Sequence, residues 1–243
     1  MLLPERPPAG YDGAKAWEGM TVKNVAEAAS GERRKRDASA TRAELIAAAT
    51  DEFAEKGLAG ARVEEIAART ATSKHMIYYH FGSKDGLYRA VLEQAYEQFR
   101  IAEGSLDYDD LPALDALSTL VGATFDVHAS RPQIVRIIMA ENINLGQQIR
   151  SIDSFQQREL ALATMRRILD RGAEEGTLRR GLDPLQIHLT VAALCFHYIA
   201  NVHTFSHVFE LEAHSPDQMT LRRNEVIATV VSRCAATTGM EDR

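Results

Sequence analysis

Apolar residues recur at helical spacing along most of this chain, and this period constrains the fold more than any other feature. Tyr88, Leu92, Ala95, Phe99 and Ala102, for example, follow one another every three or four residues, which places them on one face of an α-helix. Beyond short ambiguous runs, the sequence lacks the alternation with a period of two that strands require. It therefore predicts an all-α protein with about nine helices.

Capping residues, glycines and prolines indicate where the predicted helices begin and end. Thr41 and Glu44 form a T-x-x-E capping box at the expected start of the first helix, and Gly57 is its expected end. Proline directly after Asp183 or Ser215 is typical of a first helical position. The further helices are predicted around 63–67 and over 73–82, 83–104, 112–130, 132–145, 154–176, 183–205 and 215–238.

Three regions differ in pattern and charge. Residues 1–37 hold early prolines and the run GERRKRD, and we expect a flexible extension. Residues 38–88 hold the short helices and residues 89–243 the longer ones. The formal net charge of −6 argues against coating nucleic acid by bulk charge. Residues 31–89 are nevertheless mildly basic and the rest acidic, so a polyanion would meet the N-terminal part.

The basic run RRKR at 33–36 has two interpretations. It is either a solvated tail or a flexible arm that enters the minor groove of DNA beside a helix-turn-helix.

Several classes of protein are disfavoured by what the sequence lacks. The N-terminus does not have the layout of a secretory signal, and we find no apolar run near the ~18 residues of a membrane span, so no membrane partner is expected. Cys195 and Cys234 form no disulfide framework, which fits a reducing cytoplasm. Hydrolase, metalloprotease, Walker and dinucleotide-binding motifs are also missing, which argues against an enzyme and against a cofactor.

A histidine pair near the end of one predicted helix is compatible with metal binding. His203 and His207 lie four residues apart, and Glu210 follows, so the three share a face. No fourth ligand is evident, and a solvent-facing or interface cluster is the favoured interpretation. We therefore predict no metal site.

The segment 63–81 predicts two short helices joined by a tight turn at 70–72. If Ile77 points toward the core, a rotation of 100° per residue directs His75 and Tyr79 outward. Lys74, Met76 and Tyr78 lie in the first turn or on the flanks of that outward face. A short helix that exposes aromatic rings, a histidine and a cation fits the major groove of DNA.

A second feature of this segment points to phosphate. Lys84 stands at the start of the next predicted helix, where unpaired N–H groups and the helix dipole favour an anion.

With these motifs, the stretch 41–99 resembles the DNA-binding domain of TetR-family transcriptional regulators. The chain reads F-A-E-K-G at 53–57, I-A at 66–67, S-K-H-M-I-Y-Y-H-F at 73–81 and S-K-D-G-L at 83–87. The resemblance implies a helix-turn-helix domain over 38–88 and an effector-binding and dimerisation domain over 89–243. It implies DNA contacts at Arg62, Lys74, His75, Met76, Tyr78, Tyr79, His80 and Lys84.

The chain departs from the family pattern at three places. Ala61 and Arg62 stand where threonine or serine usually caps the second helix, so Arg62 is the candidate phosphate contact. Thr70 and Ala71 replace the usual Ala-Gly at the turn, which restricts the backbone there. The residues at 74–76 are bulkier than the usual small ones.

The implied function is that of a ligand-responsive transcriptional regulator, most simply a cytoplasmic repressor. One short helix reads too few bases, so we expect a homodimer on a pseudo-palindromic operator of double-stranded DNA. The alternative is a ligand-independent activator or an architectural DNA-binding protein.

Two predicted helices suit the dimer. Residues 189–202 are apolar nearly all round, which indicates burial against both the chain's own core and a partner. In the last helix, the predicted seam consists of Val226, Ile227, Val230, Val231 and Cys234.

Polar and aromatic residues on the apolar faces of the middle helices are candidates for an effector site. A polar group on such a face needs a partner, which can be the backbone or a ligand. Asn142 continues the apolar series of Val135, Ile138 and Met139, and Asn201 follows His197 by one turn. The predicted effector contacts are Phe125, His128, Met139, Asn142, His197 and Asn201, and they suggest a small aromatic or carboxylate-bearing ligand.

Overall fold

The computed structural model describes residues 22–104, 108–152 and 158–237. Within these ranges the chain is α-helical and has no strand, only one isolated bridge between Leu178 and Ala235. The prediction of an all-α fold with about nine helices is confirmed for this part. The chain separates into two compact units, residues 1–45 and 46–243, and the core and sites described below belong to the second.

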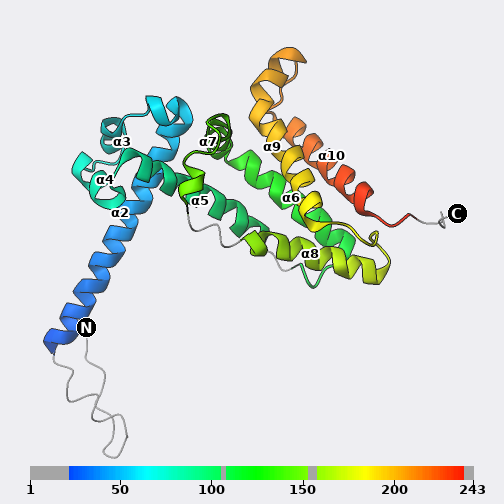
Figure 1. Cartoon of the computed structure of the whole chain (residues 1–243), viewed down its shortest axis with the longest axis horizontal. Helices are drawn as coiled ribbons and strands as arrows, with labels where there is room; N and C mark the ends of the chain where they lie inside the picture. Colours follow the sequence, from blue (N-terminus) through cyan, green and yellow to red (C-terminus); the bar gives the residue numbers. More distant parts are fainter. Residues whose placement is uncertain (1–21, 105–107, 153–157, 238–243) are drawn as a thin grey trace, which may run out of the picture. The chain divides into compact units, whose positions relative to one another are not determined.

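Helices α3 and α4 are short, with 7 and 8 residues, and the longer helices from α5 onward form the larger bundle (Figure 1). They are α2 (Val22–Gly60), α3 (Val63–Arg69), α4 (Lys74–Phe81), α5 (Lys84–Gly104), α6 (Ala113–Ser130), α7 (Pro132–Ile143), the 3₁₀ helix η1 (Ile149–Ser151), α8 (Arg158–Glu175), α9 (Pro184–Val208) and α10 (Pro216–Cys234).

Most predicted helix starts are confirmed by their caps. The Ser73 hydroxyl accepts the Met76 backbone N–H at 3.4 Å at the start of α4. The Asp183 carboxylate does the same for Leu185 at 2.9 Å at the start of α9. These side chains satisfy N–H groups that have no partner within the helix.

The predicted start of the first helix at Thr41 is wrong. Helix α2 begins at Val22 and continues through the capping-box residues. The preceding residues are mostly Ala, Glu, Lys and Arg, which are strong helix formers, so nothing stops the helix there. The RRKR run therefore has helical backbone, whereas residues 1–21 lie outside the described part.

The expected end at Gly57 corresponds to a sharp break. Gly57 has φ 66° and ψ 173°, in the region that favours glycine, and one further turn brings the chain to Gly60. The other helix ends differ from the predicted ones by a few residues, as at α10, which ends at Cys234.

Helix α6 forms the centre of the larger bundle and contacts α5, α7, α8, α9 and α10. Leu117, Val121 and Phe125 of α6 are buried in one apolar cluster, together with residues of α8, α9 and α10. Removal of these side chains from water is the main stabilising contribution to the bundle.

Three of the five residues of the predicted dimer seam on α10 belong to the chain's own core, whereas Ile227 and Val231 are only partly buried. Val226, Val230 and Cys234 are each at most 1% exposed and lie in the cluster around α6. The seam was recognisable as apolar, but periodicity alone cannot tell which neighbour covers it.

Helix α9 buries one face and exposes another. Ile187, Val191 and Cys195 are buried, whereas Leu189 on the opposite side is 51% exposed. Its 25 residues are long and apolar enough on average to cross a membrane by length and composition, although Gln, Thr, His and Asn side chains interrupt the apolar run, as the sequence indicated. The buried face packs in the α6 cluster, as a core helix of a bundle does.

Candidate DNA-binding and effector sites

Helices α3 and α4 and the turn between them form the predicted helix-turn-helix. Ile77 is completely buried, whereas Tyr78 and Tyr79 are 41% and 73% exposed. Lys74 and His75 are exposed on the same helix. The predicted inward and outward directions on α4 are thus confirmed for these residues.

The turn contains a strained residue. Ala71 has φ 50°, which lies in the left-handed region that a side chain disfavours. The family pattern has glycine at this position. Its replacement by alanine therefore leaves a side chain on left-handed backbone.

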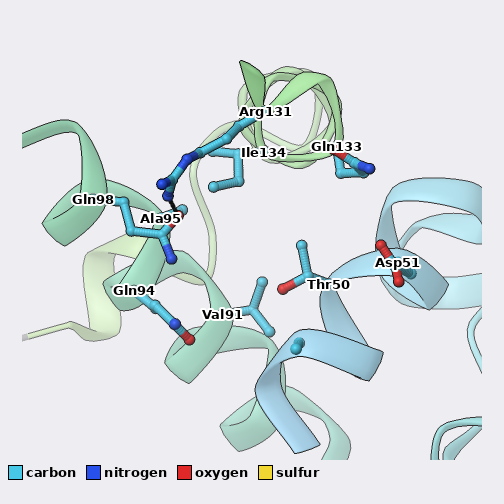
Figure 2. Close-up of a pocket in the computed structure, with 10 residues that line it drawn as sticks. Thr50, Asp51, Val91, Gln94, Ala95, Gln98, Arg131, Gln133 and Ile134 are labelled. Atoms are coloured by element: carbon cyan, nitrogen blue, oxygen red, sulfur yellow. Dashed lines mark hydrogen bonds between the residues drawn. The ribbon is translucent and has the colours of Figure 1, made fainter. Parts of the chain in front are cut away.

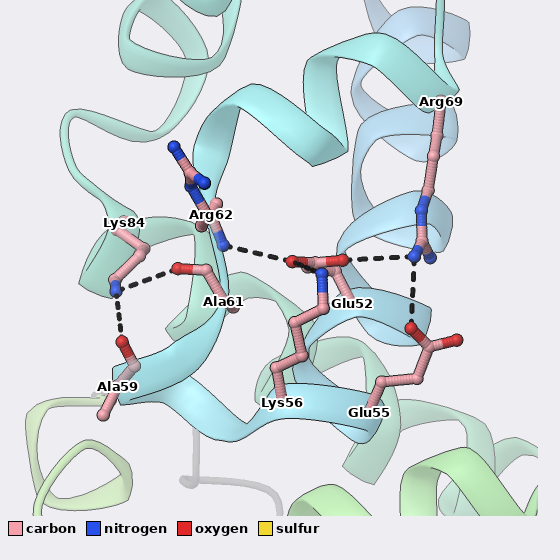
Figure 3. A network of polar contacts seen from close by, with 8 residues as sticks. All are labelled: Glu52, Glu55, Lys56, Ala59, Ala61, Arg62, Arg69 and Lys84. Atoms are coloured by element: carbon pink, nitrogen blue, oxygen red, sulfur yellow. Dashed lines mark hydrogen bonds and ion pairs between the residues drawn. The ribbon is translucent and has the colours of Figure 1, made fainter.

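A buried carboxylate holds α2 and α3 together (Figure 3). Glu52 of α2 is completely buried, and its Oε1 accepts hydrogen bonds from Lys56 Nζ at 2.8 Å and from the Arg62 backbone N–H at 3.2 Å. Its Oε2 accepts from the Arg69 guanidinium at 3.1 Å. Because Arg62 precedes α3 and Arg69 ends it, this one side chain fixes both ends of α3.

These partners keep Glu52 ionised. Burial by itself raises the pKa of a carboxyl group, but here the hydrogen bonds from Lys56 and Arg62 and the charges of Lys56 and Arg69 outweigh it. The pKa of Glu52 therefore lies below its ordinary value.

Two of the predicted DNA contacts have partners within the protein. Lys84 Nζ donates to the carbonyl oxygens of Ala61 at 3.2 Å and Ala59 at 3.4 Å, after the break in α2 (Figure 3). Lys74 Nζ forms an ion pair with Glu64, which raises the pKa of the lysine. Lys84 and Lys74 therefore lie beside α4, and the Nζ atom of each already contacts a partner within the protein.

The remaining predicted DNA contacts differ in exposure. Arg62 is exposed, and Figure 3 shows its guanidinium pointing away from Glu52. Met76 and His80 are half-buried, and the His80 ring lies 5.2 Å from that of Tyr79. His80 Nε2 is buried without a hydrogen-bond partner in the described part of the chain.

Phe125 and His128 on α6 are buried, as expected of a site inside the bundle. The His128 ring stacks on Phe99 of α5 at 4.5 Å and meets Phe196 of α9 edge-on at 6.5 Å. Its Nδ1 lies 2.7 Å from the Thr124 carbonyl oxygen. Burial lowers the pKa of His128, and the contact with Thr124 only partly opposes this effect.

The expectation that Asn142 lies on the buried face of its helix is wrong. Asn142 is exposed, and its amide donates to the Ile138 carbonyl oxygen at 2.8 Å. Met139 is 39% exposed as well. The buried face of α7 runs instead through Ile134, Val135, Ile137, Ile138 and Glu141.

His197 is exposed and Asn201 partly exposed on α9, and the two residues contact each other. The Asn201 amide donates to the His197 carbonyl oxygen at 2.8 Å, and its nitrogen is 3.3 Å from His197 Nδ1. The six predicted effector residues therefore fall into three separate places, on α6, α7 and α9.

A pocket of about 300 Å³ lies elsewhere, between α2, α5 and the start of α7 (Figure 2). We call it the junction pocket. Its apolar lining consists of Ala47, Val91, Ala95 and Ile134. Its polar lining consists of Thr50, Asp51, Gln94, Gln98, Arg131 and Gln133. None of the predicted effector residues contributes to it.

Sequence reasoning missed two buried carboxylates. Glu52 follows Ala49 by three residues, and Glu141 follows Ile138 by three, so each lies on an apolar face. Glu141 Oε1 accepts the backbone N–H groups of Gln148 and Ile149 at 2.8 and 3.0 Å and thereby closes the turn after α7. A charged residue on an apolar helix face was the signal in the sequence that could have identified both carboxylates.

The described part of the chain holds no group of three His, Cys, Asp or Glu side chains placed to bind a metal ion. His203, one of the two histidines considered above for metal binding, lies beside His214, with the ring centres 4.6 Å apart and the rings tilted by 49°.

Comparison with known proteins identifies relatives over both halves. A profile of bacterial regulatory proteins of the tetR family matches residues 45–91, and one of the tetracyclin repressor-like C-terminal domain matches residues 114–230. The HTH-type transcriptional repressor NicS of Pseudomonas putida is 33% identical over 174 residues, which are 71% of this chain and 82% of that protein. The repressor SCO4008 of Streptomyces coelicolor is 36% identical over 46% of this chain and 54% of its own.

Solved structures share the fold. A bacterial regulatory protein of the tetR family from Rhodococcus RHA1 superposes with a TM-score of 0.62 at 22% identity, covering 81% of this chain and 98% of that one. The similarity to NicS covers 71% of this chain, and both profiles are of tetracyclin repressor-type regulators. The chain therefore belongs to the TetR family, and it is a helix-turn-helix transcriptional regulator.

Proposed function

We propose that this regulator is a repressor that binds a pseudo-palindromic operator as a homodimer and leaves it when a small molecule binds. The observation that carries the proposal is the exposed face of α4. His75, Tyr78 and Tyr79 are exposed there although α4 is anchored by the buried Ile77. Aromatic and imidazole groups held rigidly on a short helix suit base edges and methyl groups in the major groove.

The residues around α4 supply the phosphate contacts of the proposed interface. Arg62 points outward before α3 and can neutralise a phosphate directly. Lys84 and Lys74 are candidates at the edges of α4, where DNA phosphates would compete with the Ala61 carbonyl and the Glu64 carboxylate. Such contacts orient a protein on DNA without reading sequence.

Exposed apolar side chains on α9 and α10 support dimerisation through these helices. Leu185 and Leu189 of α9 and Leu221 of α10 are all more than 40% exposed. Helix α9 carries no Asp, Glu, Lys or Arg along its length. An uncharged apolar surface of this kind favours burial against a second copy, which brings two recognition helices to one operator.

We further propose that the effector binds at the buried aromatic cluster around His128. Phe99, Phe125 and Phe196 accompany this histidine inside the bundle. A small aromatic or carboxylate-bearing ligand is the proposed occupant, and α5 connects this cluster to Lys84 beside α4. Regulation of this type places the protein in the cytoplasm, without an enzymatic role.

The test starts by selecting operator sequences from a random duplex library with the full-length protein. Two half-sites in inverted repeat, bound by one dimer in sedimentation, are the expected result. Tyr79→Ala should weaken binding to the selected duplex about tenfold or more while leaving the melting temperature unchanged, because the ring is exposed. Selection of a single half-site, or unchanged affinity in the Tyr79 variant, would contradict this proposal.

A further inference from the structure

The junction pocket has a polar atom that its own protein leaves unsatisfied. Gln94 Oε1 is buried and has no hydrogen-bond partner in the described part of the chain. Figure 2 shows Gln94 extending from α5 toward α2, with Thr50 across the space. Buried side-chain oxygens are nearly always hydrogen-bonded in folded proteins. A turn of the Gln94 side chain would bring this oxygen to the pocket, where the donor of a ligand could satisfy it.

The pocket also carries one cation and one anion on different walls. Arg131, just before α7, donates to Gln98 Oε1 and has further N–H groups to offer, since a guanidinium holds five. Asp51 lies on α2, on the far side of the pocket in Figure 2. Neither residue forms an ion pair among the described residues, although Asp51 lies near enough to Arg69 to raise its pKa. The charges match a ligand with both signs and no net charge.

The rest of the lining is apolar. Val91 and Ala95 of α5 and Ile134 of α7 are buried side chains that reach the pocket wall. A ligand here would therefore gain from an apolar side chain as well as from its charged groups.

We propose that the junction pocket binds a free α-amino acid with an apolar side chain. Its carboxylate would pair with Arg131, its ammonium group would donate to Gln94 Oε1 and toward Asp51, and its side chain would contact Val91 and Ile134. A planar guanidinium suits a carboxylate. An ammonium group has three N–H donors, which the oxygens of Gln94 and Asp51 can accept.

Occupancy would bear on DNA binding through α2. Asp51 directly precedes Glu52, the carboxylate that holds both ends of α3. A ligand that ties α2 to α5 and α7 would restrict the positions that the helix-turn-helix can adopt. This consequence rests on the proposed repressor function, whereas binding itself does not.

The experiment titrates L-leucine into the full-length protein without DNA, with binding followed by the methyl NMR signals of Val91 and Ile134. We expect saturable shifts with a dissociation constant on the order of 1 mM or tighter. Two analogues act as matched probes: 4-methylpentanoate lacks the amino group and 3-methylbutylamine lacks the carboxylate. Each should bind at least about tenfold more weakly than leucine.

Variants then test the assigned residues. Arg131→Gln and Gln94→Leu should each weaken leucine binding about tenfold, whereas Arg136→Gln, at an exposed position of α7, should not. Melting curves confirm that the variants are folded. Absence of methyl shifts at saturating leucine, or wild-type affinity for leucine in both pocket variants, would overturn the assignment. Either result leaves operator binding intact, so its failure is distinguishable from failure of the repressor proposal.

Discussion

The Glu52 carboxylate on α2 lies 3.1 Å from the Arg69 guanidinium at the end of α3, and the two groups differ in their surroundings. The carboxylate is completely buried, whereas 37% of the arginine side chain is exposed. Water therefore supports the cation, while the anion depends on its protein partners. The helix-turn-helix is thus most sensitive to change on the α2 side of this pair.

Replacement of that carboxylate should loosen the helix-turn-helix. Glu52→Gln keeps the size of the side chain but removes the charge that Lys56 and Arg69 contact, so we expect a loss of about 1–3 kcal/mol in the free energy of unfolding. Urea denaturation measures this change in the free energy of unfolding. The matched control is Glu55→Gln, whose exposed carboxylate also contacts Arg69 and should matter by at most about 0.5 kcal/mol. Equal effects of the two variants would show that burial of Glu52 is unimportant.

Mild acid should destabilise the protein through His128. Burial lowers its folded-state pKa below the ordinary 6.5, so the unfolded chain binds the proton more readily. The free energy of unfolding should fall as the pH drops below 6.5 and level off below the folded-state pKa. Burial lowers the pKa of His188 too, which adds to the same trend.

The check compares urea unfolding across this pH range in the wild type and in His128→Asn. Asparagine can still donate to the Thr124 carbonyl but cannot titrate, so its pH dependence should be smaller. His75→Asn, on an exposed histidine, should keep the wild-type dependence. An unchanged slope in the His128 variant would mean that other groups cause the acid sensitivity.

Relief of the strained turn should stabilise the protein. Ala71→Gly removes the side chain from a left-handed backbone, a gain that slightly exceeds the extra flexibility of glycine in the unfolded chain. We expect an increase of up to about 1 kcal/mol in the free energy of unfolding. Ala68→Gly, at an exposed position of α3, should instead lower the free energy of unfolding by about 1 kcal/mol. A loss in both variants would argue against strain at Ala71.

Lys84 and His75 should affect DNA binding differently. Lys84→Ala should lower the melting temperature and weaken binding to cognate and scrambled duplexes alike, because Lys84 holds the Ala59 and Ala61 carbonyls and adjoins phosphate in our proposal. His75→Ala should leave melting unchanged and alter the preference among bases. Salt titrations on both duplexes measure the two effects. A changed cognate-to-scrambled ratio in the Lys84 variant would refute its role as a phosphate contact.

Two apolar positions should separate dimerisation from folding. Leu189→Glu places a charge on the exposed face of α9 and should yield folded monomers, whereas Val230→Glu buries a charge in the core and should unfold the chain. Sedimentation and circular dichroism distinguish these outcomes. A dimer that survives the Leu189 substitution would place the interface on another surface.

The sequence by itself determined the helices and the faces of the recognition helix. Caps such as Ser73 and Asp183 act within one turn, and the outward direction of Tyr79 follows from helix geometry once Ile77 is buried. These features depend on neighbours three or four residues apart, which the sequence displays directly.

Only the tertiary structure decided which helix covers each apolar face and which charged side chains form ion pairs. Val230 proved to lie in the chain's own core, Asn142 to face solvent, and Glu52 to contact Arg69 seventeen residues away. The start of α2 was likewise misjudged, because a capping box does not end a helix whose preceding residues also favour it. Burial and ion pairing arise between segments distant in sequence, and helical periodicity carries no information about their relative placement.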